Sequence, residues 1–471
     1  MAGVDPPPAP PPAGSTIPPR GLPMPIEFVR PRSSDAWAAY APHRGEPWDL
    51  RRVVHLHRRA GFAATWEELR RDLEDGPEAS IDRVLQGRSR SCGIPGEFAA
   101  LADRLADQAL ADLAPNRLKG WWIYRMLCGP DPLEERLTLM WHNHFATSNL
   151  KVNDLALMRR QNETLRSHCR APFGRLLCAM LRDPALLIWL DAPDNAKGQP
   201  NENLARELME LFTLGVGHYT EADVKEAARA LTGWRLSFED LRFVASRHDA
   251  GTKTILGRAG AFDADSLARL LLEHPGTSRR LARRLCHEFL GTGAVDEIAV
   301  DALAAGLCAR DLDVGWGVAT VLRSRAFFAE EGLGRRIASP VEYVLGAVRA
   351  LELLDPPPST PVLADWCGRL SQDLFYPPNV GGWPGGRAWI TTRSMIGRAN
   401  FSAALVEGES VGLPGPVDAP ALAARHGQGR NPAFFSQLLL GSDVPTISAS
   451  DGAGLRRAVA RLLASPAGQL A

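Results

Sequence analysis

Two glutamates on one predicted helix are the first residues whose types and spacing could support chemistry. Residues 201–215 read NENLARELMELFTLG, with leucines at helical spacing. In a helix that starts near Asn201, Asn203, Glu207 and Glu210 fall at i, i+4 and i+7 and form one polar row. Polar side chains against a core need hydrogen bonds, cationic partners or a metal ion. This row is therefore the first candidate site.

Histidines elsewhere in the chain could complete a metal site around these carboxylates. Imidazole and carboxylate ligands suit zinc, manganese or iron, and a bound metal can activate water for hydrolysis. One glutamate would be a ligand and the other a general base. An aspartate beside a histidine could orient its imidazole. The predicted metal ligands are His142, His144, Glu207 and Glu210, and the predicted catalytic residues are Glu207, Glu210, His248 and Asp249.

A structural role for the same glutamates is the alternative. Arg206 and Glu210 form an i,i+4 pair, and Arg229 or Arg235 could neutralise the remaining charge. The sequence leaves the choice between a metal site and a network of ion pairs open.

A loop rich in glycine and proline at 376–389 could form a pocket wall. It reads YPPNVGGWPGGRAW, so it combines backbone freedom with two tryptophans. We expect Trp383 and Trp389, together with Asn203, to contact a substrate.

Composition and missing motifs exclude several classes of protein. The chain has 471 residues, 45% of them hydrophobic, and its 54 basic residues balance 54 acidic ones, so no overall field favours nucleic acid or an anionic membrane. Its seven cysteines are scattered without a C-x-x-C pair, which argues against a disulfide framework. No apolar run approaches the ~18 residues of a membrane span. The sequence also lacks a Walker A loop, a G-x-S-x-G elbow and a G-x-G-x-x-G fingerprint.

The elements that must position these residues are helices. Helical periodicity begins near Asp49 and continues, with few interruptions, to the segment 455–464. Capping boxes are predicted at Thr65 and Thr220. We predict an all-α fold with one large multi-helical domain over 33–471, a small hairpin insertion within 234–257, and a disordered proline-rich tail over 1–32.

Several motifs in order resemble a widespread bacterial family known as domain of unknown function 1800. The resemblance covers nearly the whole chain after the proline-rich tail. It is carried by His55-x-x-Arg58-Arg59-x-Gly61-Phe62, Trp141-His142-Asn143-His144-Phe145, Asn201-Glu202-Asn203-x-Ala205-Arg206-Glu207-Leu208-x-Glu210-Leu211, Leu231-Thr232-Gly233-Trp234, His248-Asp249, Gly382-Trp383 and Leu463-Ala464-Ser465-Pro466.

The resemblance implies a mostly helical fold and brings no established activity. Family members often look exported and are often encoded beside a sulfatase- or phosphatase-like partner. This sequence shows no recognisable signal peptide, so we predict a cytoplasmic protein. Three hypotheses follow: a metal-dependent hydrolase that uses a divalent ion, a non-catalytic assembly or binding partner of a sulfatase/phosphatase-like protein, and a cytosolic enzyme that tailors a natural product.

Overall fold

The computed structural model describes most of the chain after residue 34. The described residues are 35–90, 95–237, 240–408, 411–413, 415–429, 431, 433–443 and 451–471. The predicted proline-rich tail over 1–32 lies outside them. Helices account for 62% of the residues, so the predicted all-α fold is confirmed.

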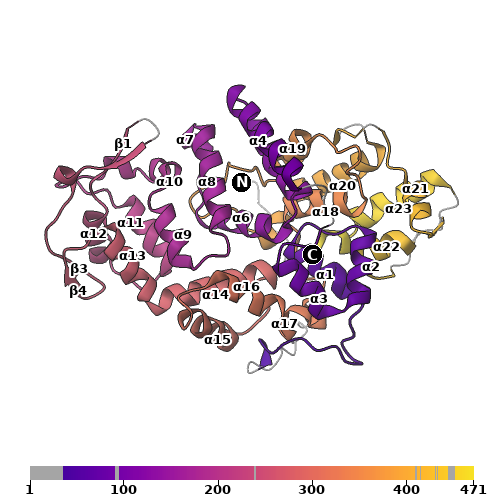
Figure 1. Ribbon diagram of the computed structural model, residues 1–471, viewed down its shortest axis with the longest axis horizontal. Coiled ribbons are helices and arrows are strands. Elements are labelled where there is room, and N and C mark those ends of the chain that lie inside the picture. The colour runs from indigo at the N-terminus through magenta and orange to yellow at the C-terminus, as the bar shows by residue number, and fades with distance from the viewer. Residues whose placement is uncertain are drawn as a thin grey trace, which may run out of the picture.

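The first half of the chain forms short and medium helices joined by tight loops (Figure 1). They are α1 (Leu50–Ala60), α2 (Trp66–Asp75), α3 (Pro77–Leu85), α4 (Pro95–Ala111), α5 (Pro115–Cys128), α6 (Pro132–His144), α7 (Asn149–Val152), α8 (Leu155–Ser167), α9 (Phe173–Met180), α10 (Pro184–Trp189), α11 (Asn203–Glu207) and α12 (Glu221–Ala230).

Helices also dominate the second half. They are α13 (Ala264–Glu273), α14 (Pro275–Phe289), α15 (Glu297–Cys308), α16 (Val314–Leu322), α17 (Arg325–Phe328), α18 (Pro340–Ala350), α19 (Thr360–Arg369), α20 (Thr392–Glu407), α21 (Ala419–Arg425), α22 (Ala433–Leu440) and α23 (Gly452–Ala464).

Two small antiparallel sheets interrupt the helices between α12 and α13. β1 (Trp234–Ser237) pairs with β2 (Asp240–Phe243), and β3 (Lys253–Ile255) pairs with β4 (Arg258–Gly260). The predicted hairpin is therefore present, and a second hairpin follows it.

Local sequence signals fix several helix starts. The Thr65 hydroxyl accepts a hydrogen bond from the Glu68 amide, and the Glu68 carboxylate accepts one from the Thr65 amide at 2.9 Å. The same capping box recurs at Thr220 and Asp223, so both predicted boxes are confirmed.

The predicted helix over 201–215 departs from regular α geometry. It begins at Asn203, and after Glu207 it widens into the π-helical turn η3 (Leu208–Thr213). The Leu214 amide consequently donates to the carbonyl of Met209, five residues earlier. A π-turn changes the angular spacing of side chains from that of an α-helix, and the predicted i, i+4, i+7 row depends on that spacing.

Buried apolar side chains form two cores. The first core collects residues of α9 and α11 to α17, including Phe173, Leu208 and Leu285. The second core collects residues of α2, α4, α5 and α18 to α23, including Trp122 and Phe401. In Figure 1 the elements of the two cores lie largely on opposite sides of α6 and α8. Helices α1, α6 and α8 contribute side chains to both.

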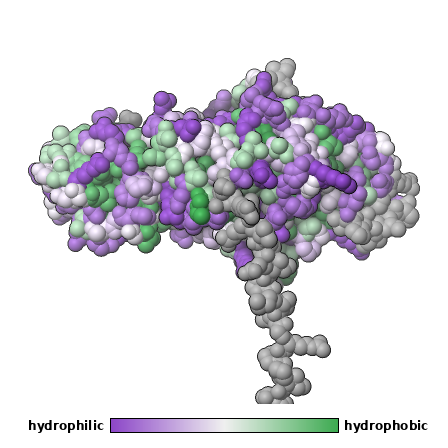
Figure 2. Space-filling model, turned by 90° about the horizontal axis from the view of Figure 1, so that it is seen from below, coloured by the Kyte–Doolittle hydropathy of each residue, from purple (hydrophilic) through white to green (hydrophobic). Residues whose placement is uncertain are grey.

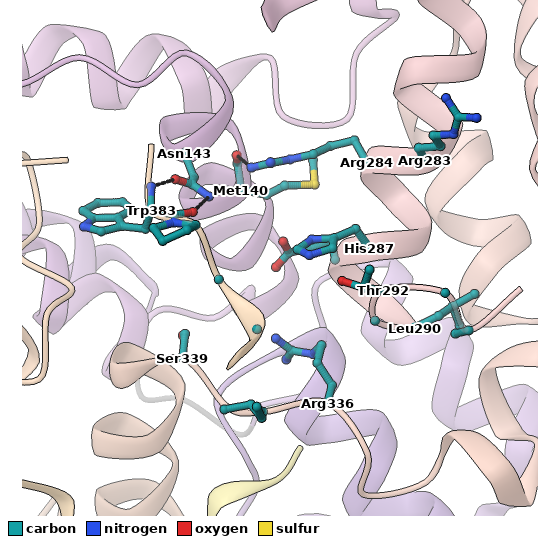
Figure 3. A pocket seen from close by; sticks show the side chains of 18 of the residues that line it. Met140, Asn143, Arg283, Arg284, His287, Leu290, Thr292, Arg336, Ser339 and Trp383 are labelled. Atoms are coloured by element: carbon teal, nitrogen blue, oxygen red, sulfur yellow. Dashed lines mark hydrogen bonds between the residues drawn. The ribbon is translucent and has the colours of Figure 1, made fainter. Parts of the chain in front are cut away.

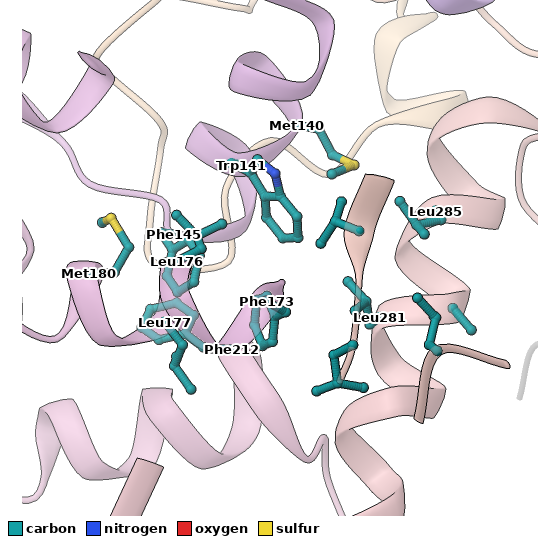
Figure 4. Packing of buried hydrophobic residues seen from close by; sticks show 14 of the residues in the cluster. Met140, Trp141, Phe145, Phe173, Leu176, Leu177, Met180, Phe212, Leu281 and Leu285 are labelled. Atoms are coloured by element: carbon teal, nitrogen blue, oxygen red, sulfur yellow. The ribbon is translucent and has the colours of Figure 1, made fainter. Parts of the chain in front are cut away.

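Aromatic side chains of α6 anchor it in the first core. Figure 4 shows Trp141 and Phe145 beside Phe173 and Phe212. The Trp141 and Phe173 rings stack with centroids 5.6 Å apart, and the indole of Trp141 donates to the carbonyl of Cys169 at 3.0 Å. This packing fixes the end of α6, which carries both histidines of the WHNHF motif.

The surface is mixed in polarity. Figure 2 shows hydrophilic side chains over much of one face, with smaller groups of hydrophobic residues between them. Among the described residues, none of the helices combines the length and the apolar character that crossing a membrane requires.

Candidate functional site: an arginine-lined pocket between two cores

A cavity of about 1150 Å³ opens where elements of the two cores meet. Helix α14 and the turn 214–218 line it from the first core, and the segments 335–339 and 381–389 line it from the other side. The end of α6 contributes Met140, Asn143 and His144. Sites for small molecules typically occupy ~300–1,000 Å³, so this cavity has room for a ligand larger than a single phosphate ion.

The lining is strongly basic although the whole chain is neutral. Among the described residues that line the cavity, eight arginines face three glutamates, together with four histidines, and none is a lysine or an aspartate. A concave site lined by one sign of charge concentrates ligands of the opposite sign. The residues are Arg136, Arg279, Arg280, Arg283, Arg284, Arg335, Arg336, Arg387, Glu288, Glu331, Glu342, His55, His144, His218 and His287.

Two of the arginines are neutralised by Glu288 and Glu342. Arg136 pairs with Glu288 at 2.7 Å and also with Glu342, and Arg336 forms a two-pronged pair with Glu342. Burial alone would raise the pKa of Glu342, but Arg136 and Arg336 hold that pKa well below its usual value. These four side chains form a closed ion-pair network in the pocket wall.

Arg279 and Arg283 form ion pairs with carboxylates on another side of α14. Both pair with Glu297, at 2.9 and 2.5 Å, and Arg279 also pairs with Asp301. In Figure 3 the Arg283 side chain points away from the other labelled pocket residues. Neither side chain therefore offers its full charge to a ligand.

Arg280 and Arg284 differ, because both side chains donate hydrogen bonds to main-chain carbonyls. Nε of Arg280 donates to Leu211 at 2.6 Å, and an amino nitrogen of Arg284 donates to Met140 at 2.8 Å. Burial lowers the pKa of both guanidinium groups, and the charge of Arg284 lowers that of Arg280 further. With an ordinary value of 12.5, both stay charged at neutral pH. They retain positive charge that no carboxylate of the described residues binds directly.

His287 lies one turn after Arg284 and reaches into the same space (Figure 3). Burial lowers the pKa of this imidazole, and Arg284 and Arg336 lower it further against the opposing effect of Glu288. His287 is therefore neutral at pH 7 and can accept a proton.

Asn143 holds the glycine-rich wall in place. Its side-chain oxygen accepts a hydrogen bond from the Trp383 amide at 2.7 Å, and its side-chain nitrogen donates to the Trp383 carbonyl at 3.3 Å (Figure 3). Gly382 has φ of +76°, and a Cβ there would lie 2.2 Å from the side-chain oxygen of Asn143. Only glycine allows this close approach.

The two predicted histidine ligands lie in different cores. His142 is fully buried among Trp122, Phe375 and Trp383, and burial lowers its pKa to about 3. Neither of its ring nitrogens has a hydrogen-bond partner in the part of the chain that the structure describes.

His144 instead faces the first core. Its Nε2 donates to the carbonyl of Phe212 at 3.1 Å, and burial lowers its pKa well below the usual value. This histidine lines the pocket and links α6 to the π-turn, and the imidazoles of His142 and His144 have separate surroundings.

The predicted acidic row does not line the pocket. Glu210 accepts a hydrogen bond from the Tyr219 hydroxyl at 2.7 Å. The pKa of Glu207 is raised by burial and by the charge of Glu210. The side-chain nitrogen of Asn203 donates to Asp191 at 3.3 Å.

His248 and Asp249 support local structure. Arg229 binds both carboxylate oxygens of Asp249, at 2.7 and 3.3 Å, and holds its pKa at about 2. Nδ1 of His248 donates to the Thr232 carbonyl at 3.0 Å, and the Asp249 amide donates to the Thr232 hydroxyl at 2.8 Å. These contacts tie the two motifs that flank the first hairpin.

The described side chains do not assemble the predicted divalent metal site. No group of three or more His, Cys, Asp or Glu side chains that could hold a metal ion occurs among them. His144 is the one predicted ligand that lines the pocket, while His142, Glu207 and Glu210 do not. The tryptophans Trp383 and Trp389 do line it, although both are more than nine-tenths buried. Their role as substrate contacts stays a prediction.

Sequence reasoning overlooked the basic row of α14. Arg280, Arg284 and His287 stand at i, i+4 and i+7 in a segment that was correctly predicted to be helical. The doublets Arg279-Arg280 and Arg283-Arg284 were a visible signal for one basic face. Whether these arginines can bind a ligand depends on which of them pair with carboxylates, and tertiary structure determines that pairing.

Fold and site together define an all-helical protein with a basic pocket between two cores. The chain belongs to the family described as protein of unknown function (DUF1800), whose sequence model matches residues 55–469. No curated protein and no solved structure matches the chain significantly.

Proposed function

We propose that this protein binds a ligand bearing phosphate or sulfate groups in the arginine-lined pocket. The proposal rests on the contacts that the guanidinium groups of Arg280 and Arg284 make. Both line the cavity, and their side chains donate to main-chain carbonyls and pair with no carboxylate of the described residues. Guanidinium groups match the geometry of phosphate and sulfate oxygens through two parallel hydrogen bonds.

The surroundings of these arginines strengthen their attraction for an anion. The carbonyls of Leu211 and Met140 hold the two guanidinium groups in place, so less side-chain freedom is lost on binding. Glu288 lies near Arg284, but it already pairs with Arg136. A ligand anion would therefore find the charge of Arg284 only partly neutralised.

The hypotheses drawn from the sequence differ in what would follow binding. Metal-dependent hydrolysis at Glu207 and Glu210 remains a proposal without support from the contacts of these side chains. Binding beside a sulfatase/phosphatase-like partner accords better with the pocket, because such partners act on esters of the same two anions. Tailoring of a natural product has no residue that favours it.

The test is anion binding by the purified protein and two variants. We expect sodium phosphate or sodium sulfate to bind the wild type in isothermal titration calorimetry, with affinity that falls as salt rises. Arg284→Gln should weaken binding about tenfold or more, because a charge-assisted hydrogen bond contributes about 1.5–3 kcal/mol.

Arg258→Gln is the matched control. Arg258 is exposed, pairs with Glu273 and does not line the pocket. Equal loss of affinity in both variants, or no binding of either anion to the wild type at millimolar concentration, would contradict the proposal.

A further inference from the structure

Three basic side chains run along one face of α14. Arg280, Arg284 and His287 are separated by four and three residues, so at 1.5 Å per residue the row extends roughly 10 Å. A single phosphate or sulfate can contact neighbouring guanidinium groups, but it cannot reach the full length of this row and the opposite wall as well.

The opposite wall of the pocket passes the end of this row and carries a further cation. A Cβ on Gly385 would lie 3.6 Å from Cε1 of His287, so the loop passes directly beside that imidazole. Two residues later, Arg387 is exposed and lines the pocket. Within the described part of the chain its side chain has no hydrogen bond or ion pair. Its charge is open to a ligand.

The two walls are anchored in different cores. Leu281 and Leu285 of α14 are buried in the first core, whereas Trp383 and Trp389 of the loop are buried in the second. Arg284 and Arg387, neither of which has an ion-paired carboxylate among the described residues, therefore face one cavity from separate packing units. Figure 3 shows α14 on one side of the pocket and Trp383 on the other.

We propose that the ligand is a compact polyanion with at least two phosphate or sulfate groups, which bridges the two walls. One group would sit on Arg280 and Arg284 and another at Arg387. This inference rests on the proposed function and adds the multiplicity of charge. The cavity volume of about 1150 Å³ supports it, since a lone anion would fill a small part of that space.

The wall of the same pocket contains the neutral ion-pair network formed by Arg136, Arg336, Glu288 and Glu342. Its charges cancel through direct ion pairs, so it lines the same pocket without adding a third positive subsite. A polyanion that bridges the two walls would place one group on each of the two positive subsites. His287 follows Arg284 on α14 and lies beside Gly385 of the loop, and it would gain a proton more readily once nearby arginine charge is neutralised.

The experiment compares single anions with polyanions on the full chain. Sodium phosphate, sodium sulfate, tripolyphosphate and sucrose octasulfate are titrated into wild type, Arg284→Gln, Arg387→Gln and the control Arg258→Gln. We expect at least one polyanion to bind tenfold or more tightly than the corresponding single anion. Comparison of sodium phosphate with sodium sulfate shows which of the two groups is preferred.

Arg387→Gln isolates the bridging step. This variant should leave single-anion affinity within about threefold of wild type and remove most of the polyanion advantage, whereas Arg284→Gln should weaken both kinds of ligand. Arg387 is exposed, so the substitution should leave the fold intact, which circular dichroism checks.

The outcomes separate the two proposals. If Arg387→Gln keeps the full polyanion advantage while Arg284→Gln still weakens single anions, the bridging inference is wrong and the proposed function stands. If Arg258→Gln removes the advantage equally, the gain reflects general surface charge and bridging is again wrong. If no anion binds the wild type, both proposals fail.

Discussion

Replacing Gly382 by alanine should uncouple the glycine-rich loop from α6. At φ of +76° an alanine costs about 1–2 kcal/mol in backbone strain. The added methyl would lie 2.2 Å from the side-chain oxygen of Asn143, so the carboxamide must leave its place. Two hydrogen bonds to Trp383 are then lost, at about 1 kcal/mol each. We expect the free energy of unfolding to fall by about 3–4 kcal/mol.

The matched control is Gly386→Ala in the same loop. Gly386 also has positive φ, at +54°, but nothing lies within 4 Å of a Cβ built there. The Gly386→Ala variant should lose only the stability that backbone strain costs, about 1–2 kcal/mol of the free energy of unfolding. Urea unfolding followed by tryptophan fluorescence measures both variants. Equal losses for Gly382→Ala and Gly386→Ala would refute the reasoning, because the contact with Asn143 would then contribute nothing.

A double variant tests the same contact from the other side. Asn143→Ala removes the side-chain oxygen that the new methyl would meet, so the combined variant with Gly382→Ala should lose less stability than the sum of the two single losses. The main-chain carbonyl of Asn143, 2.6 Å from the same methyl position, keeps part of the clash. Strict additivity would show that these residues do not interact.

Three further predictions concern Glu207, His142 and the helices that contribute to both cores. Glu207→Gln should leave the free energy of unfolding unchanged or raise it by less than about 1 kcal/mol, because it removes repulsion from Glu210. Elemental analysis of wild type and the same variant tests metal binding. A near-stoichiometric metal that is lost on substitution would show that Glu207 is a metal ligand after all. His142→Leu should flatten the pH dependence of unfolding between about pH 6.5 and 3. The pKa of His142 is about 3 in the folded protein and about 6.5 when unfolded. Its contribution to the free energy of unfolding is therefore full above pH 6.5 and falls as the pH falls, by up to about 1.4 kcal/mol per pH unit. Urea titrations at several pH values measure this free energy, and the same pH dependence in wild type and variant would contradict the prediction. Finally, α1, α6 and α8 serve both cores, so we expect circular dichroism and fluorescence to follow one unfolding transition, and two separated transitions would show independent units.

Local chemistry made most helices predictable. The capping boxes at Thr65 and Thr220 lie where the sequence indicated. These signals depend on neighbours three or four residues apart, so they need no knowledge of the fold. The family resemblance likewise rested on ordered motifs and is confirmed over residues 55–469.

The candidate site was harder to predict because its chemistry is set by long-range pairing. The segment around Glu207 looked like a functional row only if α-helical spacing continued, and the π-turn changes that spacing. His142 and His144 looked like a ligand pair, yet the helix directs them into different aromatic surroundings. Arg284 carries the proposed site because its carboxylate neighbour Glu288 is paired with Arg136, which no local pattern discloses.

The π-turn at Leu208–Thr213 also bears on how family members should be compared. A π-turn is equivalent to one residue inserted into an α-helix. A chain one residue shorter between Asn203 and Gly215 would return to α spacing and rotate the following carbonyls by about 100°. The Leu211 and Phe212 carbonyls would then miss Arg280 and His144. The length of this segment, more than the identity of its residues, should therefore track the presence of the basic pocket across the family.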